Sequence, residues 1–174
     1  MIFENKKVLW IVVSASFVML LAIYSCASFQ LPAPRQDIQS ILIIPTVKME
    51  GPTQSHFNKF ELYVKGMGEK ILLNPRHKFT MISMLEPGEY EIYKLRIVYE
   101  DRRSEDKTYD LDVKFTLKPG YITILSSGLY WQMFSKGHKR GMYFGFGEVP
   151  DDYRNSLISE LRKDKNFHLW SVLP

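Results

Sequence analysis

The residues of this chain that could do chemistry begin with two carboxylates placed two positions apart, Asp110 and Asp112. They alternate with apolar residues, so an extended backbone would place both on one face, about 7 Å apart. Glycoside hydrolysis uses a pair of carboxylates that flank the scissile bond. Lys114 and Lys118 continue the same face, however, and we favour the simpler interpretation of a solvated strand surface.

Other catalytic chemistry has little support in the sequence. The four histidines include no pair at the i, i+4 spacing of a helical metal site, and none stands near a cysteine. The Gly-x-Ser-x-Gly nucleophile elbow is absent. The glycine-rich stretch 141–147 lacks the Lys-Ser/Thr pair of a phosphate loop. We therefore predict no catalytic residue, no metal and no cofactor.

The single cysteine, Cys26, has the most informative surroundings. Lys6 and Lys7 precede a largely apolar run from Val8 to Tyr24, and Ser25 stands directly before the cysteine. A basic segment, an apolar segment and a small residue at the cleavage position are the three parts of a secretory signal. A lone cysteine outside the cytoplasm cannot form an internal disulfide, so it requires another explanation.

The sequence Ile23-Tyr24-Ser25-Cys26 resembles the lipobox of bacterial lipoproteins, although Tyr24 stands where that family usually has a small residue. In that family the cysteine thiol receives a diacylglyceryl group, and the signal is cut before the acylated cysteine. The resemblance implies a signal peptide over residues 1–25 and lipidation of Cys26. One alternative is an uncleaved single-pass membrane helix, because the apolar run is only slightly shorter than the roughly 20 residues of a span. A buried helix of a soluble domain is a further alternative.

Both membrane interpretations place residues 27–174 outside the cytoplasm, because Lys6 and Lys7 favour a cytoplasmic N-terminus. Ala27 and Ser28 follow the cysteine, in positions where an aspartate tends to retain Gram-negative lipoproteins at the inner membrane. The resemblance therefore implies a cell-envelope protein of the outer membrane, if the bacterium is Gram-negative, with its domain lipid-anchored.

Residues 26–37 are predicted to be the lipidated cysteine and a tether, because Pro32 and Pro34 favour an extended chain. Residues 38–174 are long enough for one domain, and they read mainly as β. In 109–118 the odd-numbered residues are apolar or aromatic and the even-numbered residues are polar, which indicates a strand with one buried face. Further strands are expected at 41–44, which is apolar throughout, and at 60–65, 78–84, 89–99, 121–125 and 142–146.

Two Leu-x-Pro-Gly segments, 85–88 and 117–120, have the signature of type II turns, and each is followed by a tyrosine in a β run. One helix is expected at about 151–163, with Asp151 as its N-cap and basic residues in its last turn. We therefore predict an antiparallel β-sandwich with one helix, preceded by an N-terminal apolar signal helix. The turn pattern resembles that of transthyretin-like and immunoglobulin-like domains of small bacterial envelope lipoproteins, which implies the same fold class.

A candidate recognition site combines an aromatic segment with a basic loop. Tyr130 and Trp131 precede a loop that could contact an anionic envelope polymer or lipid headgroup, with Lys136, His138, Lys139 and Arg140 as its charged or titratable residues. The alternative, which we favour, places the aromatic side chains in the core and the basic residues at a solvated hairpin tip.

The net charge of +4 is spread along the chain and lacks the clustered basic stripe of a nucleic-acid-binding protein. We therefore predict no nucleic-acid partner and a non-enzymatic binding or scaffolding module. Its partners would be the membrane, through the lipid anchor, and another envelope protein or an anionic envelope polymer. An envelope enzyme that acts on glycans is the alternative, and a structural assembly partner is a third possibility.

Replacement of Cys26 tests the anchor. We expect Cys26→Ala to abolish incorporation of radiolabelled palmitate and to impair removal of residues 1–25, because the thiol is the site of acylation in the lipoprotein family. Radiolabel retained by the variant would contradict this prediction. A mature wild-type mass that still includes residues 1–25 would instead indicate the uncleaved membrane helix.

Overall fold

The described part of this computed structural model covers residues 29–34, 39–48, 59–99, 106–136 and 139–173, with backbone alone at 133–136 and 139–142. Met1–Gln30 and Leu31–Pro174 are separate units, and the elements below belong to the second. The predicted signal peptide and Cys26 lie outside the described residues.

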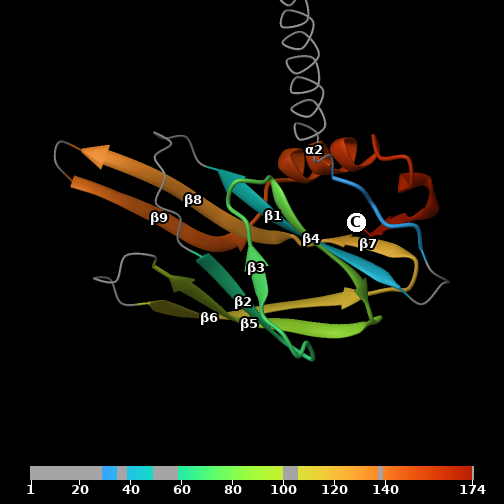
Figure 1. Cartoon of the computed structure of the whole chain (residues 1–174), viewed down its shortest axis with the longest axis horizontal. Coiled ribbons are helices and arrows are strands. Elements are labelled where there is room, and N and C mark those ends of the chain that lie inside the picture. Colours follow the sequence, from blue (N-terminus) through green and yellow to red (C-terminus); the bar gives the residue numbers. More distant parts are fainter. Residues whose placement is uncertain (1–28, 35–38, 49–58, 100–105, 137–138, 174) are drawn as a thin grey trace, which may run out of the picture. The chain divides into compact units, whose positions relative to one another are not determined.

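The second unit is mainly β, as predicted, with two sheets and one α-helix (Figure 1). One sheet has six strands: β10 (Ser171–Leu173), β7 (Tyr121–Ile124), β1 (Ser40–Lys48), β8 (Ser127–Lys136), β9 (Lys139–Glu148) and, paired with β1, β4 (Phe79–Leu85). The other sheet has four: β3 (Ile71–Leu73), β2 (Lys59–Lys65), β5 (Gly88–Val98) and β6 (Lys107–Leu117). The helix is α2 (Asp151–Leu161), and a short 3₁₀ helix, η1 (Phe167–Leu169), precedes β10.

The apolar run predicted at 41–44 is the centre of the six-stranded sheet. In β1, the residues from Ser40 to Thr46 are buried. One edge of β1 pairs antiparallel with β4, and the other pairs parallel first with β7 and then with β8. The strand continues through Pro45, although we expected it to end there.

Strands β7 and β8 accommodate Pro45 together. Ile43 pairs with Ile124 of β7, and Thr46 pairs with Leu129 of β8. Between these two pairings the β7–β8 segment has two more residues than β1 has. The irregularity lies beside Pro45, which has no N–H for a sheet hydrogen bond. Gly128 is required there, because a Cβ atom at this position would lie 2.5 Å from the Pro45 carbonyl oxygen.

The prediction of an antiparallel sandwich is correct for one sheet only. All pairings in the four-stranded sheet are antiparallel, whereas β7 runs parallel to β1 and to β10, and β8 runs parallel to β1. Between β1 and β7 the chain builds the whole four-stranded sheet and also strand β4. A connection of that length allows a strand to return in the same direction. Residue alternation reports which face is buried and carries no information on strand direction.

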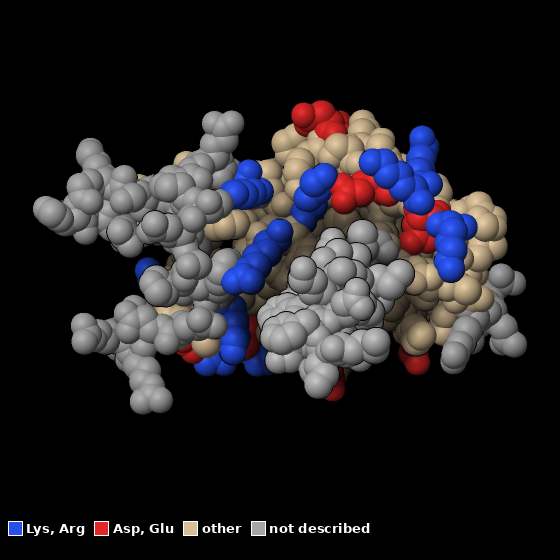
Figure 2. All heavy atoms as spheres, turned by 45° about the horizontal axis from the view of Figure 1, so that its top comes forward, with Lys and Arg blue, Asp and Glu red and all other residues tan. Residues whose placement is uncertain are grey.

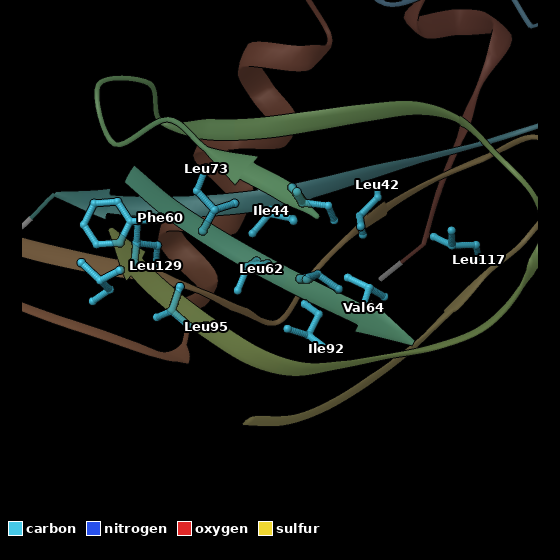
Figure 3. Close-up of a cluster of buried hydrophobic side chains, with 13 residues drawn as sticks. Leu42, Ile44, Phe60, Leu62, Val64, Leu73, Ile92, Leu95, Leu117 and Leu129 are labelled. Carbon is cyan, nitrogen blue, oxygen red and sulfur yellow. The ribbon is translucent and has the colours of Figure 1, made fainter. Parts of the chain in front are cut away.

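The main core lies between the two sheets. Leu42 and Ile44 from β1 and Leu129 from β8 pack with Phe60 and Leu62 from β2 and with side chains from β3, β5 and β6 (Figure 3). In β6 the predicted faces are confirmed for residues 111–117, whose odd-numbered members contact this core, and the even-numbered residues 108–116 are exposed. Tyr109, which we assigned to the buried face, is 38 % exposed. Because β6 is an edge strand, Phe115 is only half-buried, stacked 5.6 Å from the ring of Tyr90.

Helix α2 packs on the face of the six-stranded sheet that points away from the four-stranded sheet (Figure 1). Its Leu157 and Leu161 are buried, and the Tyr153 hydroxyl donates a hydrogen bond to the Thr46 carbonyl oxygen at 2.7 Å. The helix begins at the predicted residue, but Pro150 occupies the N-cap position that we assigned to Asp151. It ends at Leu161, two residues earlier than predicted, so the basic residues that we placed in its last turn follow the helix.

Truncation of the core tests this packing. We expect Phe60→Ala to lower the free energy of unfolding by about 3–5 kcal/mol, because the ring is almost fully buried between the sheets. Urea denaturation measures the loss. The matched control is Lys114→Ala on the exposed face of β6, which should change stability by less than about 0.5 kcal/mol. Similar losses at both positions would contradict the assigned faces.

Candidate binding surface

The aromatic residues of the predicted recognition site are mostly interior. Trp131 is 7 % exposed, which agrees with the alternative that we favoured, in which the aromatic side chains lie in the core. It follows Leu129 on the core-facing side of β8, where apolar packing determines its direction. Tyr130 is half-buried, and its hydroxyl donates a hydrogen bond to the Glu148 carbonyl oxygen. Burial, and then the charge of Glu148, raises the pKa of Tyr130.

The basic part of that site is described only in its backbone. In the backbone register of the β8–β9 hairpin, Lys136 lies opposite Lys139 at the hairpin end, and Arg140 lies opposite Ser135. The side chains of the three basic residues, and His138 entirely, lie outside the described residues. Contact between this loop and an anionic surface therefore stays a prediction.

The carboxylates that suggested glycoside hydrolysis lie on the exposed face of β6. Asp110 and Asp112 are both exposed, and Asp112 forms an ion pair of 3.6 Å with Lys114. This is the solvated strand surface that we favoured. Within the described residues, no group of three His, Cys, Asp or Glu side chains is placed to hold a metal ion.

A different charged cluster lies on the outer face of the four-stranded sheet. In β2, residues alternate between the core and this face, which receives Glu61 and Tyr63. Residue Glu61 is only 4 % exposed, because three neighbours cover its carboxylate. Lys70 forms an ion pair with it, the Tyr63 hydroxyl donates a hydrogen bond of 3.1 Å, and Arg96 lies 3.7 Å away. Arg96 is in turn held by Asp106 at 2.6 Å.

These contacts determine the protonation of Glu61. Burial alone would raise the pKa of its carboxyl group. The hydrogen bonds from Lys70 and Tyr63 and the charges of Lys70 and Arg96 act in the opposite direction and outweigh it, so the pKa lies below the ordinary value of 4.5. The side chain is therefore an ion-paired structural carboxylate at neutral pH and is not poised to exchange a proton.

Two tyrosine rings stand beside this cluster. The centroids of Tyr63 and Tyr93 lie 6.3 Å apart in an edge-to-face arrangement. The Lys94 ammonium group lies 4.1 Å from the centroid of Tyr63 and 5.6 Å from that of Tyr93, within the range of cation–π attraction. The aromatic pair is thus held in place by a cation on the same sheet face.

Two adjacent hollows are both lined by the turn that precedes β3, and the first of them lies beside these rings. The first has a volume of about 560 Å³ and is lined by both tyrosines. The second has a volume of about 530 Å³ and lies between β3 and β4. Both are also lined by Leu72 and by residues 67–70. We define the Leu72 surface as the wall of these hollows formed by Tyr63, Met67, Lys70, Leu72, Met84 and Tyr93.

Exposed apolar side chains distinguish the Leu72 surface. Leu72 is 56 % exposed and Met84 is 57 % exposed. Strand β4 has a bulge, with one extra residue between its pairings to Leu42 and Ser40, and Met84 there has a φ of 62°. A positive φ is uncommon for a residue other than glycine, and such conformations concentrate at functional sites. Methionine side chains adapt to differently shaped partners, so this surface is suited to binding.

Sequence reasoning missed the Leu72 surface. The alternation at 60–65 was recognised, but its polar face was treated only as solvated. The signal that could have directed attention there is the short Gly66-Met67-Gly68 segment followed by an isolated apolar run, Ile71-Leu72-Leu73. The bulge that exposes Met84 has no comparable sequence signal.

Comparison with known proteins adds no relative: no protein-family model, no curated protein and no solved structure matches this chain. In the part of the chain that the structure describes, no helix combines the length and apolar character that a membrane crossing needs.

The Glu61 cluster predicts a pH dependence of stability. Because the folded-state pKa is depressed, the cluster stabilises the fold above about 4.5, and this contribution is lost as the pH falls through the folded-state value. We expect Glu61→Gln to be less stable than wild type at neutral pH and the difference to shrink in acid, measured by urea unfolding at several pH values. Glu89→Gln, at an exposed position of β5, is the control and should show no such convergence.

Proposed function

We propose that this protein is a cell-envelope lipoprotein, anchored by an acylated Cys26, whose domain is a non-enzymatic binding module. The anchor is supported by the basic residues, the apolar run and the lipobox-like Ile23-Tyr24-Ser25-Cys26. The residues after the cysteine favour the outer membrane in a Gram-negative cell. Two facing sheets and the Pro-Gly turn at 119–120, where Gly120 has a φ of 76°, agree with a relation to transthyretin-like or immunoglobulin-like envelope domains. The parallel strand pairs depart from it, as does Gly88, which lies in β5 without the positive φ that a type II turn requires.

The observation that carries the binding role is the Leu72 surface. It places two exposed apolar side chains and two tyrosine rings around adjacent hollows. Tyrosine and methionine are enriched at protein interfaces, where they supply contact area. The surface therefore suits a segment of another envelope protein better than a small polar ligand.

The backbone around the Leu72 surface supports the same role. Among the described strands, β3 pairs only with β2, and β4 pairs only with β1, so each leaves one edge without a partner strand. An extended segment of a partner can add to such an edge by backbone hydrogen bonds, with its side chains in adjacent hollows. We propose this mode of contact for the partner protein.

Photo-crosslinking in intact cells tests the binding role. A benzophenone-bearing residue replaces Leu72 in one variant and Met84 in another. Because both positions line the same hollow, we expect both to give one crosslinked product of the same mass. Met84→Glu should remove the product from position 72 while the unfolding midpoint stays unchanged, because this side chain is largely exposed.

The matched control is the same crosslinking residue at Tyr143, which is 62 % exposed on β9 and lies outside both hollows. Equal products from positions 72 and 143, or a product that survives Met84→Glu, would contradict binding at the Leu72 surface.

A further inference from the structure

The start of the second unit is fixed to its C-terminal end. Residue Leu31 is fully buried. Its N–H donates a hydrogen bond of 2.9 Å to the Asp164 carboxylate, and its carbonyl oxygen accepts one of 2.6 Å from the Asn166 side-chain amide. The Trp170 indole N–H donates a third, of 3.0 Å, to the Pro32 carbonyl oxygen. Residues 31–32, predicted to belong to a free tether, are thus part of the folded domain.

The hydrogen bonds of Leu31 and Pro32, which we call the clamp, limit the distance between the domain and its anchor. Five residue steps separate Cys26 from Leu31. A fully extended chain covers at most about 3.6 Å per residue, so the clamp lies within roughly 18 Å of the acylated cysteine. The surface around Asp164 and Trp170 is therefore kept within reach of the lipid.

The turn that follows α2 is basic, whereas α2 itself carries Asp151, Asp152 and Glu160. Arg162, Lys163 and Lys165 are all exposed in the turn that follows α2. The one acidic residue between positions 162 and 173 is Asp164, and its oxygens accept hydrogen bonds from the N–H groups of Leu31 and Asn166. Figure 2, which turns the helix side toward the reader, shows Lys and Arg side chains on this side of the molecule with Asp and Glu side chains among them.

An apolar side chain accompanies the three cations. Leu169, in η1, is 44 % exposed and is one of the few large apolar side chains on the described surface. Cations around an exposed leucine are the composition that binds at an anionic lipid interface, where the charges attract headgroups and the apolar group enters the boundary region. We define the Lys163 surface as Arg162, Lys163, Lys165 and Leu169.

We propose that the Lys163 surface lies on the anionic headgroups of the membrane that holds Cys26. The inference rests on the proposed lipid anchor and adds an orientation to it. Helix α2 and the Lys163 surface then face the lipid, and the four-stranded sheet, on the far side of the six-stranded sheet, faces away (Figure 1). The Leu72 surface is thereby presented to other envelope proteins.

The charges should have a measurable effect. Each Lys or Arg near an anionic surface changes the equilibrium constant between the docked and the undocked orientation of the domain by about fivefold at moderate salt. Three cations together therefore change this equilibrium constant by about a hundredfold. The effect should fall as salt is added, because charges are screened over about 8 Å at physiological ionic strength.

A quenching experiment with the full-length protein tests this orientation. The protein is reconstituted in vesicles of phosphatidylcholine and phosphatidylglycerol in equal parts, with a quencher on some headgroups. A maleimide dye is attached at His168→Cys, beside the Lys163 surface, or at Asp112→Cys, on the exposed face of β6. An acylated Cys26 has no free thiol, so the wild-type protein should stay unlabelled.

We expect quenching at position 168 to exceed quenching at position 112 by at least fivefold. Added to His168→Cys, the triple exchange Arg162→Gln, Lys163→Gln and Lys165→Gln should remove this excess, as should vesicles of phosphatidylcholine alone. The matched control, Lys59→Gln, Lys107→Gln and Lys114→Gln, removes three exposed cations of the four-stranded sheet and should leave the excess intact.

Equal quenching at positions 168 and 112 would overturn the orientation, and an excess that persists in the Arg162, Lys163 and Lys165 triple variant would overturn the role of these cations. Dye uptake by the wild-type protein would show a free Cys26 thiol and overturn the anchor. A failure of the anchor is therefore detected as dye uptake by the wild-type protein. A failure of the orientation is detected only by comparing the quenching of the dye at positions 168 and 112.

Discussion

The complete enclosure of β1 is the constraint on which the rest of the second unit depends. This strand has neighbours on both edges and packed side chains on both faces: Leu42 and Ile44 point to the sheet–sheet core, and α2 covers the opposite side. An apolar strand of this kind is stable only where every backbone group is paired and every side chain is buried. Strands from the C-terminal half, β7 and β8, provide one entire edge, which brings the α2–β10 region against the start of the domain.

Local patterns in the sequence predict the parts of the fold that depend on one segment at a time. The alternation at 109–118 identifies which side of β6 is buried, and the apolar run at 41–44 identifies a strand without a solvated face. The parallel pairings of β1 and the hydrogen bonds of Leu31 depend on partners more than eighty residues away, about which neighbouring residue types carry no information. For the candidate sites the limit is similar, because the bulge at Met84 results from sheet packing and not from residue type. The burial of Trp131, in contrast, agrees with the interpretation that its apolar neighbours favoured.

The two faces of the domain handle charge in different ways. On the four-stranded sheet, Glu61 is covered by Lys70, Tyr63 and Arg96, so opposite charges neutralise one another next to the Leu72 surface. In the turn after α2, Asp164 is the one acid between positions 162 and 173, and its oxygens accept hydrogen bonds from backbone N–H groups. A neutralised sheet face and a basic turn after α2 suit two different partners, a protein and an anionic lipid surface.

The position of β1 in the chain also has a consequence for the order of folding. Strands β2, β3, β5 and β6 all lie between positions 59 and 117, interrupted only by β4, so this sheet is able to form while the chain is still emerging. Strand β1 comes first in the chain and can pair with β4 on one edge, but its other edge must wait for β7 and β8. Pairings between distant segments are slow because a large loop must close. Until then its apolar residues remain exposed, and this early interval is when the chain is most prone to aggregate and most in need of a chaperone.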